Sequence, residues 1–155
     1  VSPDAIVFGT GEWRAKLRVR LANLSTAAQR YAVQLGFFDT ETANLQGDAA
    51  FLLYDESTSA NWQMSTAQGA TRTTTASGTA VAAATWLRVE VVVNAAASSA
   101  EFFVDGVSLG TVATNIPSGT QKTGVGFRIH KSTGATARTL EVDYVHARCE
   151  FTSAR

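Results

Sequence analysis

The amino-acid sequence predicts an all-β domain whose two antiparallel sheets pack as a β-sandwich. Apolar and charged side chains alternate without interruption from Glu12 to Leu21, and a period of two is the pattern of a half-buried strand. Asp105-Gly106 stands between two apolar runs, as in a type I′ hairpin turn, which needs positive φ at both central residues. Stretches of helical period last no longer than a turn or two. Many short strands without helices indicate a sandwich or barrel.

Five strands are predicted in the first half of the chain. They cover residues 12–21, 30–38, 49–54, 61–66 and 70–75. Residues 55–60 are rich in Ser, Thr and Asp and predict a turn. The fourth and fifth strands pair around Ala67-Gln68-Gly69, and the threonines of the fifth have high β propensity. Ser77-Gly78 predicts the next break.

Five further strands are predicted in the second half. They cover residues 86–94, 101–104, 107–112, 124–130 and 139–148. The first of them is rich in β-branched residues, and the next two form the hairpin around Asp105-Gly106. This makes about ten strands in a single domain spanning residues 1–155. The chain begins Val-Ser-Pro, so residues 1–11 are expected to be an N-terminal extension or a linker from an upstream segment.

Composition argues against several classes of partner. Thirteen basic residues balance thirteen acidic ones, which argues against nucleic acid or an anionic membrane surface as a partner. No apolar run approaches the roughly 18–20 residues of a membrane-spanning helix. The single cysteine, Cys149, excludes an intrachain disulfide and fits assembly in a reducing cytoplasm, with Cys149 as a small apolar filler.

The first strand carries like charges on one face. Arg14, Lys16, Arg18 and Arg20 repel one another unless neighbouring strands compensate them. Glu141 and Asp143 of the last strand, or Glu90, would do so. We therefore predict that the first and last strands lie side by side; a solvated face or a groove for an acidic glycan are the alternatives.

A series of motifs carries a family resemblance over roughly residues 10–150. The motifs are Asn61-Trp62-Gln63, the Thr-rich pair, Trp86-Leu87-Arg88-Val89, Phe102-Phe103-Val104-Asp105-Gly106, Thr114-Asn115-Ile116-Pro117, residues 131–138 and Val142-Asp143-Tyr144-Val145. In this order they resemble a concanavalin A-like lectin/glucanase domain (a laminin G-like jelly roll) of the kind found in phage tail fibres, tail spikes and virion surface proteins. The resemblance implies two stacked antiparallel sheets, one of them concave, and a role in binding or particle architecture, often as a trimer.

Enzyme chemistry has little support in the sequence, and the protein is expected not to be an enzyme. Glycosidases of the resembled fold use Glu-x-Asp-x-x-Glu on one strand, with carboxyls about 5–9.5 Å apart. Glu141-Val142-Asp143 comes nearest but lacks the third carboxylate. A polysaccharide lyase would need a Tyr and His pair in a basic groove, and Tyr144 and His146 could share a face.

No cofactor is expected, and the spacing of potential ligands predicts no metal site. His130 and His146 are isolated in sequence. Calcium is the one ion considered, because Asp39, Asp48 and Asp55 lie in loops that could converge, as carboxylates do in sandwich lectins.

Carbohydrate binding is the functional prediction that the residues support best. Sugars stack on exposed aromatic rings, while amide and charged groups fix their hydroxyls. Trp62 is the candidate ring, with Gln34, Arg72 and His130 as neighbours if their strands form the concave face. The alternative is that Trp62 packs inward with Met64.

Paired phenylalanines suggest an interface. In Phe37-Phe38 and Phe102-Phe103 a period of two turns one ring outward, so Phe38 and Phe102 or Phe103 are candidates for contacts with other copies, against a second-layer contact within the domain. With the resemblance, this predicts a non-enzymatic virion component: a fibre, spike or capsid decoration domain. It would be a homotrimer that contacts other virion proteins and binds host glycan. The alternatives are a carbohydrate-binding module of a larger bacterial extracellular enzyme, and a lyase or glycosidase.

Overall fold

A computed structural model describes residues 5–40 and 47–152. Within these ranges the secondary structure consists of strands and turns, and no helix could span a membrane. The ten strands are β1 (Gly11–Leu21), β2 (Tyr31–Phe38), β3 (Ala49–Asp55), β4 (Ser59–Gln68), β5 (Thr71–Ala80), β6 (Trp86–Val93), β7 (Ala100–Val104), β8 (Val107–Val112), β9 (Gly124–Lys131) and β10 (Leu140–Phe151).

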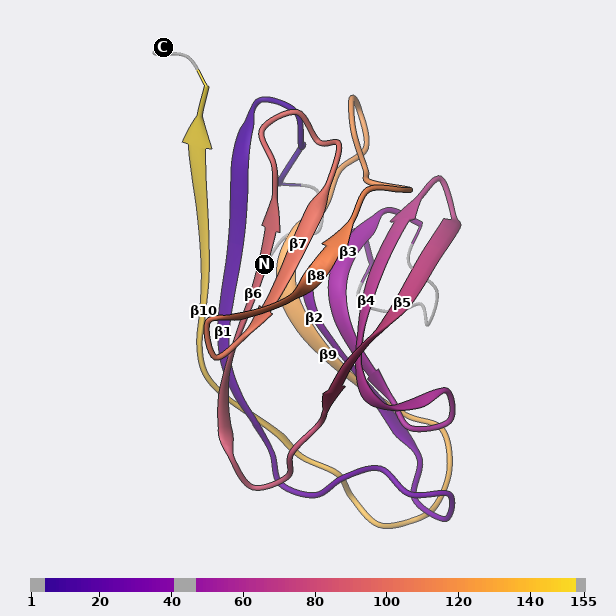
Figure 1. Cartoon of the computed structure of the whole chain (residues 1–155). Helices are drawn as coiled ribbons and strands as arrows, with labels where there is room; N and C mark the ends of the chain where they lie inside the picture. The colour runs from indigo at the N-terminus through magenta and orange to yellow at the C-terminus, as the bar shows by residue number, and fades with distance from the viewer. Residues whose placement is uncertain (1–4, 41–46, 153–155) are drawn as a thin grey trace.

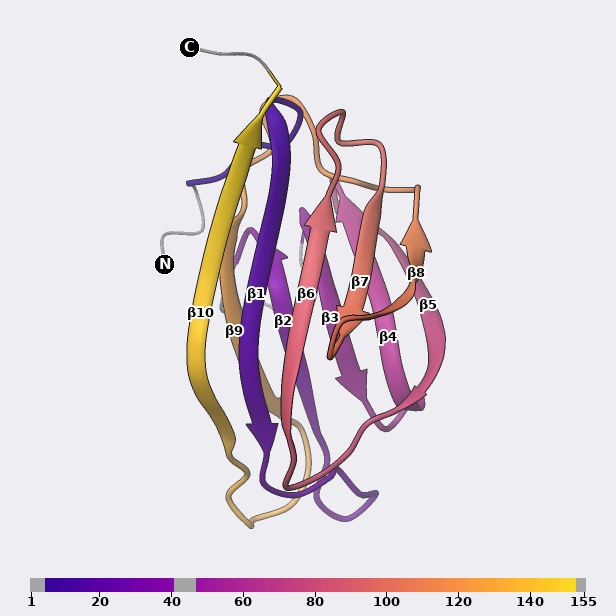
Figure 2. The ribbon, with the colours of Figure 1, turned by 60° about the vertical axis from the view of Figure 1, so that its left-hand side comes forward.

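The strands form two antiparallel sheets of five (Figure 1). The first, called here the β1 sheet, has the order β10-β1-β6-β7-β8, and the second, the β2 sheet, has the order β5-β4-β3-β2-β9. Figure 2 looks onto the β1 sheet with the β2 sheet behind it. The fold is therefore the predicted all-β jelly-roll sandwich.

The main core lies between the sheets and is filled by the alternate residues of each strand. On β1 these are Ala15, Leu17, Val19 and Leu21, all with no exposed surface. From the β2 sheet an aromatic row faces them, in which Tyr31 contacts Tyr54 edge-on, with ring centroids 5.9 Å apart, and Tyr54 contacts Trp62 at 6.3 Å. The period of two in the sequence thus corresponds to side chains that point alternately into the core and towards the surface.

The predicted strands match the observed ones to within one residue at each end, except that β10 continues to Phe151 instead of ending at Arg148 and that the bounds of β4 and β5 differ. The turn that joins them lies at Gly69 and Ala70, which have φ of +54° and +65°, and both strands are longer than expected. Ser77-Gly78 does not end β5. Gly78 has φ of +77°, and the β4–β5 register shifts between Asn61 and Gln63, so the break is absorbed as an irregularity within the strand pair.

The prediction that the first and last strands are neighbours is confirmed. β1 pairs with β10 over its whole length, with Arg20 opposite Glu141. Arg18 Nη1 lies 2.8 Å from Asp143 Oδ2, and Arg20 Nε lies 2.8 Å from Glu141 Oε2. On the other side, Glu90 of β6 pairs with Arg14 at 2.9 Å and Lys16 at 3.3 Å. The like charges of β1 are compensated from both neighbouring strands.

Residues near the N-terminus correct the expectation of a linker over residues 1–11. Ile6 and Phe8 are buried in the main core, and Phe8 contacts Phe37 edge-on at 5.2 Å. Ile6 and Thr123 exchange backbone hydrogen bonds of 2.8 Å. Burying two large apolar side chains stabilises a fold by about 1.5–3 kcal/mol each, so these residues belong to the domain. Residues 1–4 lie outside the described ranges.

We expect the domain to lose stability in alkaline solution because of Tyr31. Burial, assisted by Tyr54, raises the pKa of Tyr31 to about 12, whereas tyrosine in an unfolded chain ionises near pH 10. The unfolded chain then releases a proton that the folded chain keeps, so the free energy of unfolding falls as pH rises from about 10 towards 12. Urea midpoints measured from pH 8 to 11 should decline, and Tyr31→Phe should make the decline shallower. Equal slopes for both proteins would contradict this assignment.

Candidate functional site

The outer face of the β2 sheet carries a pocket of about 330 Å³. Its lining residues come from four strands, from the turn that follows β3 and from the residue after the end of β9. The lining residues are Tyr31, Ala32, Gln34, Leu53, Asp55, Ser57, Arg72, Arg128, His130 and Ser132. The lining thus combines an amide, hydroxyls, one carboxylate, one imidazole and two guanidinium groups with a few apolar atoms.

Strand register explains why these residues meet. Gln34 of β2 lies opposite Arg128 of β9 on one side and Leu53 of β3 on the other. One row further along β2, Ala32 lies between His130 and Asp55. Since alternate residues of a strand share a face, the two rows stack on the outer surface. The small side chain of Ala32 leaves a hollow between its taller neighbours.

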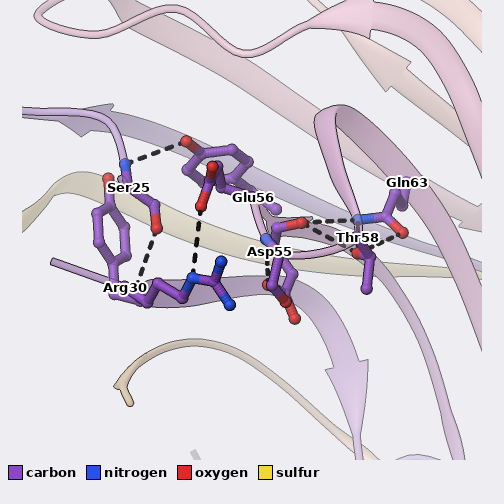
Figure 3. Close-up of polar contacts among 9 residues, drawn as sticks. Ser25, Arg30, Asp55, Glu56, Thr58 and Gln63 are labelled. Atoms are coloured by element: carbon purple, nitrogen blue, oxygen red, sulfur yellow. Dashed lines mark hydrogen bonds and ion pairs between the residues drawn. The ribbon is translucent and has the colours of Figure 1, made fainter. Parts of the chain in front are cut away.

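The turn between β3 and β4 forms one wall of the pocket, and hydrogen bonds hold it in place (Figure 3). Asp55 Oδ1 accepts hydrogen bonds from the backbone N–H and the hydroxyl of Ser57, at 3.0 and 2.6 Å. The hydroxyl of Thr58 donates to the backbone oxygen of Asp55 at 3.0 Å and accepts from Gln63 Nε2 at 2.9 Å. This Asx-type turn presents the Asp55 carboxylate and the Ser57 hydroxyl in a defined orientation.

The same close-up shows how the start of β2 is attached to this wall (Figure 3). The backbone N–H of Ser25 donates to the Tyr54 hydroxyl at 3.1 Å, and Ser25 Oγ accepts from the backbone N–H of Tyr31 at 3.1 Å. Arg30 Nε lies 3.8 Å from Glu56 Oε2. These contacts tie the loop before β2 and the start of β2 to the end of β3 and the turn after it, so the pocket has a pre-formed shape.

Arg72 reaches the pocket across an apolar cluster on the same outer face. Its guanidinium carbon lies 5.3 Å from the centre of the Phe51 ring. The cluster itself consists of Phe38, Ala49, Phe51 and Ala67, with Leu53 packed against it. Burial lowers the pKa of Arg72, an effect that the negative charge of Asp39 opposes. The side chain therefore borders both the apolar cluster and the polar pocket.

Residues 7–143 match the family described as SO2946-like, C-terminal domain. The chain belongs to this family. No curated protein sequence matches it significantly.

Solved structures similar to this SO2946-like domain share its fold. The protein of unknown function SO2946 from Shewanella oneidensis MR-1 has a TM-score of 0.65 at 15% identity over 96% of this chain, which spans 62% of that protein. Sheep galectin-11 has a TM-score of 0.58 at 14% identity, covering 96% of this chain and 95% of its own. The carbohydrate-binding module CBM66 from Bacillus subtilis has a TM-score of 0.54 at 7% identity, covering 88% and 74%. These likenesses establish the lectin-like jelly-roll fold.

The structure brings together three of the four residues proposed for sugar binding. Gln34, Arg72 and His130 all line the pocket of this SO2946-like domain. Trp62 does not, because it has no exposed surface and packs in the main core beside Tyr54. Trp62 therefore packs inward, as the alternative prediction had it, and no tryptophan ring lines the pocket. Arg128, Asp55 and Ser57 were missed, although Arg128 lies two residues before His130 and so shares its face.

A second hollow, on the outer face of the β1 sheet, is lined by Trp86 and Tyr144 together with Arg18, Arg88 and Asp105. Trp86 is 37% exposed, but Arg18 and Arg20 lie over its ring at 5.2 and 5.6 Å from the centroid. Both arginines are held by carboxylates of β10. The ring is thus already stacked by guanidinium groups, which leaves it poorly suited to a sugar.

The phenylalanines expected at an interface are largely covered within the chain. Phe102 has no exposed surface and belongs to the main core. Phe38 points to the outer face, as a period of two requires, but it is buried in the apolar cluster with Phe51. Phe103 is half-buried on the outer face of β7, opposite Glu90. Neither Phe38 nor Phe102 is available to a second copy of the chain. Phe38 instead makes the second-layer contact within the domain that was the alternative prediction.

The carboxylates considered for catalysis and for calcium have structural partners. Glu141 and Asp143 pair with arginines of β1, while Tyr144 and His146 are exposed on β10, in the sheet opposite to the pocket. Asp39 accepts hydrogen bonds from the backbone N–H groups of Gly47 and Asp48 at 3.2 and 3.1 Å. Within residues 5–40 and 47–152, no three His, Cys, Asp or Glu side chains gather as metal ligands would.

Proposed function

We propose that this domain is a non-enzymatic glycan-binding domain whose ligand occupies the pocket on the β2 sheet. The observation that carries the proposal is the gathering of Gln34, Arg72 and His130 around a pre-formed hollow of about 330 Å³. Small-molecule sites combine apolar surface with a few convergent polar groups. Here Leu53 and Ala32 provide apolar contact for a sugar ring, and the polar groups provide partners for its hydroxyls.

The fold neighbours support this choice of ligand class. The proteins of similar fold include a galectin and a carbohydrate-binding module, and a jelly-roll sheet with a polar outer face suits a sugar ligand. Their identities to this chain are low, so the proposal rests first on the pocket itself.

The absence of turnover is part of the proposal. A lyase of similar fold is known, an alginate lyase with a TM-score of 0.55 at 11% identity. Lyase chemistry needs a proton donor and acceptor at the sugar ring. Tyr31 lines the pocket, but its hydroxyl donates to the backbone oxygen of Asn23. The Tyr54 hydroxyl accepts from Ser25. Both tyrosines are thus committed to structural hydrogen bonds.

The biological setting stays a prediction from the resemblance stated above. A phage virion component, in a homotrimer with other virion proteins, would use this pocket to attach to host-surface glycan. A module of a larger extracellular enzyme would use the same pocket to keep that enzyme on its substrate.

Blocking the pocket should abolish glycan binding. Ala32→Phe places an aromatic ring in the hollow between His130 and Asp55, and we expect it to remove binding to every glycan that the unmodified protein retains on a glycan array. Thr111→Phe is the matched control, because Thr111 is exposed on β8 of the opposite sheet; it should bind as the unmodified protein does. If the unmodified protein binds no glycan, or if Ala32→Phe binds normally, the proposal is wrong. Release of sugar products from a bound ligand would instead identify a lyase or a hydrolase.

A further inference from the structure

Arg72 has hydrogen-bonding capacity that the protein does not use. Its Nε and Nη2 atoms are buried and have no hydrogen-bond partner in the structure. Among the described residues no carboxylate lies within ion-pair distance of it. Asp39 acts on its charge only from farther away. An unpaired buried charge costs free energy, so a protein that retains one at the wall of a pocket has a candidate binding group there.

The arginines of β1 differ from Arg72 in this respect. On β1, Arg14, Arg18 and Arg20 each have a carboxylate oxygen within 2.9 Å. Their charges are neutralised by strand pairing, and the net charge of the chain is zero. The contrast shows that Arg72 is not one member of a generally unpaired basic surface.

Basic side chains outnumber acidic ones in the lining of the pocket. The lining holds the side chains of Arg72, Arg128 and His130 against the single carboxylate of Asp55, and Arg72 lacks an ion-pair partner among the described residues. Asp55 already accepts two hydrogen bonds from Ser57. In a partly enclosed site such a charge distribution favours an anionic ligand over a neutral one.

We propose that the pocket selects sugars that bear a carboxylate, such as uronic or sialic acids, and that Arg72 is the residue that binds this group. The inference deepens the proposed function and rests on it. Gln34, His130 and the Ser57 hydroxyl then fix the sugar hydroxyls around the anchored carboxylate.

The geometry of the guanidinium favours a carboxylate over other anions. Nε and Nη2 lie on the same edge of the planar group, and their two parallel N–H bonds match the two oxygens of a carboxylate. That edge is buried in this structure, so binding requires the guanidinium to turn towards the pocket. The guanidinium carbon lies 5.3 Å from the centre of the Phe51 ring. The attraction between a cation and a ring face depends on the position of the charge above the ring, so turning the guanidinium about its centre does not remove this contact.

The test compares acidic glycans with neutral counterparts of the same size by titration calorimetry. The probes are oligogalacturonate, oligoguluronate and sialyllactose, each compared with its own methyl ester. At least one acidic probe should bind about tenfold more tightly than its neutral counterpart, the effect of one charge-assisted contact. Arg72→Gln should remove this difference by weakening the acidic probe alone, and Arg72→Lys should retain part of it.

Controls separate specific recognition from general charge effects. Arg148→Gln removes an exposed arginine of β10 in the opposite sheet and should leave the affinities unchanged. Thermal unfolding of each variant verifies that it is folded. The methyl esters test the need for a carboxylate with the unmodified protein, so this result does not depend on any variant. Equal affinity for acidic and neutral probes, with both blocked by Ala32→Phe, would overturn this inference and leave the proposed function standing. Failure of all glycans to bind would overturn both.

Discussion

Replacing Trp62 with alanine should lower the free energy of unfolding by about 3–5 kcal/mol. Trp62 has no exposed surface and is among the largest fully buried side chains in the described part of the protein. Its removal leaves a cavity beside Tyr54 and withdraws support from the aromatic row that continues to Tyr31. Urea unfolding followed by circular dichroism would measure the loss.

Trp86→Ala is the matched control for this change. Trp86 is 37% exposed on the outer face of the β1 sheet, and the guanidinium groups of Arg18 and Arg20 lie over its ring. Exposed cation–π contacts contribute about 0.5–1 kcal/mol, so this variant should lose about 1 kcal/mol. Equal losses for the two variants would show that Trp62 is not the core residue described here.

Gly36→Ala should destabilise the protein by roughly 2–4 kcal/mol, although it adds only a methyl group. Gly36 has φ of +142°, a conformation that residues with a side chain rarely adopt. An added Cβ would lie 2.7 Å from the backbone oxygen of Ala50 and 2.9 Å from Phe51 Cα, both on the paired strand β3. Backbone atoms of a central strand cannot move away without breaking the pairing. Thermal unfolding would detect the loss directly.

Gly126→Ala provides the control at the facing position. Gly126 of β9 lies directly opposite Gly36, and an added Cβ would meet only the end of the Phe38 ring, at 3.3 Å. A ring can shift by a few tenths of an ångström, so we expect a loss of about 1 kcal/mol or less. A large loss for Gly126→Ala together with a small one for Gly36→Ala would contradict the strain assigned to Gly36.

The fold could be predicted from the sequence because its strands are half-buried. A period of two reports which residues face the core, and the charges of β1 and β10 also reported which strands are neighbours. The irregular pairing of β4 and β5 was not predicted, since a Ser-Gly pair predicts a break and an irregularity within a strand equally well. Ile6 and Phe8 were assigned to an N-terminal extension or a linker because the chain begins Val-Ser-Pro, and two apolar residues are too few to show a period that would have corrected this.

The candidate site was predicted in part for the same reason. Gln34, Arg72 and His130 are polar residues within apolar or β-branched strands, and alternation turns such residues outward. Trp62 was ambiguous because a tryptophan suits the core and a sugar platform equally. The contribution of Asp55 and Ser57 depends on how the β3–β4 turn folds over the sheet, which a sequence pattern does not specify.

The position of β1 between β10 and β6 bears on how the chain reaches its native state. Gly11 pairs with Phe151, so the β1 sheet is completed only by contacts between distant ends of the domain, a topology associated with folding in milliseconds to seconds. During synthesis β1 emerges long before either partner and exposes two unpaired edges, which promote association with other nascent chains. Its row of arginines and lysine repels a second copy of the same strand. The charges of β1 that pair with β6 and β10 in the folded domain thus reduce association between nascent chains before those strands are synthesised.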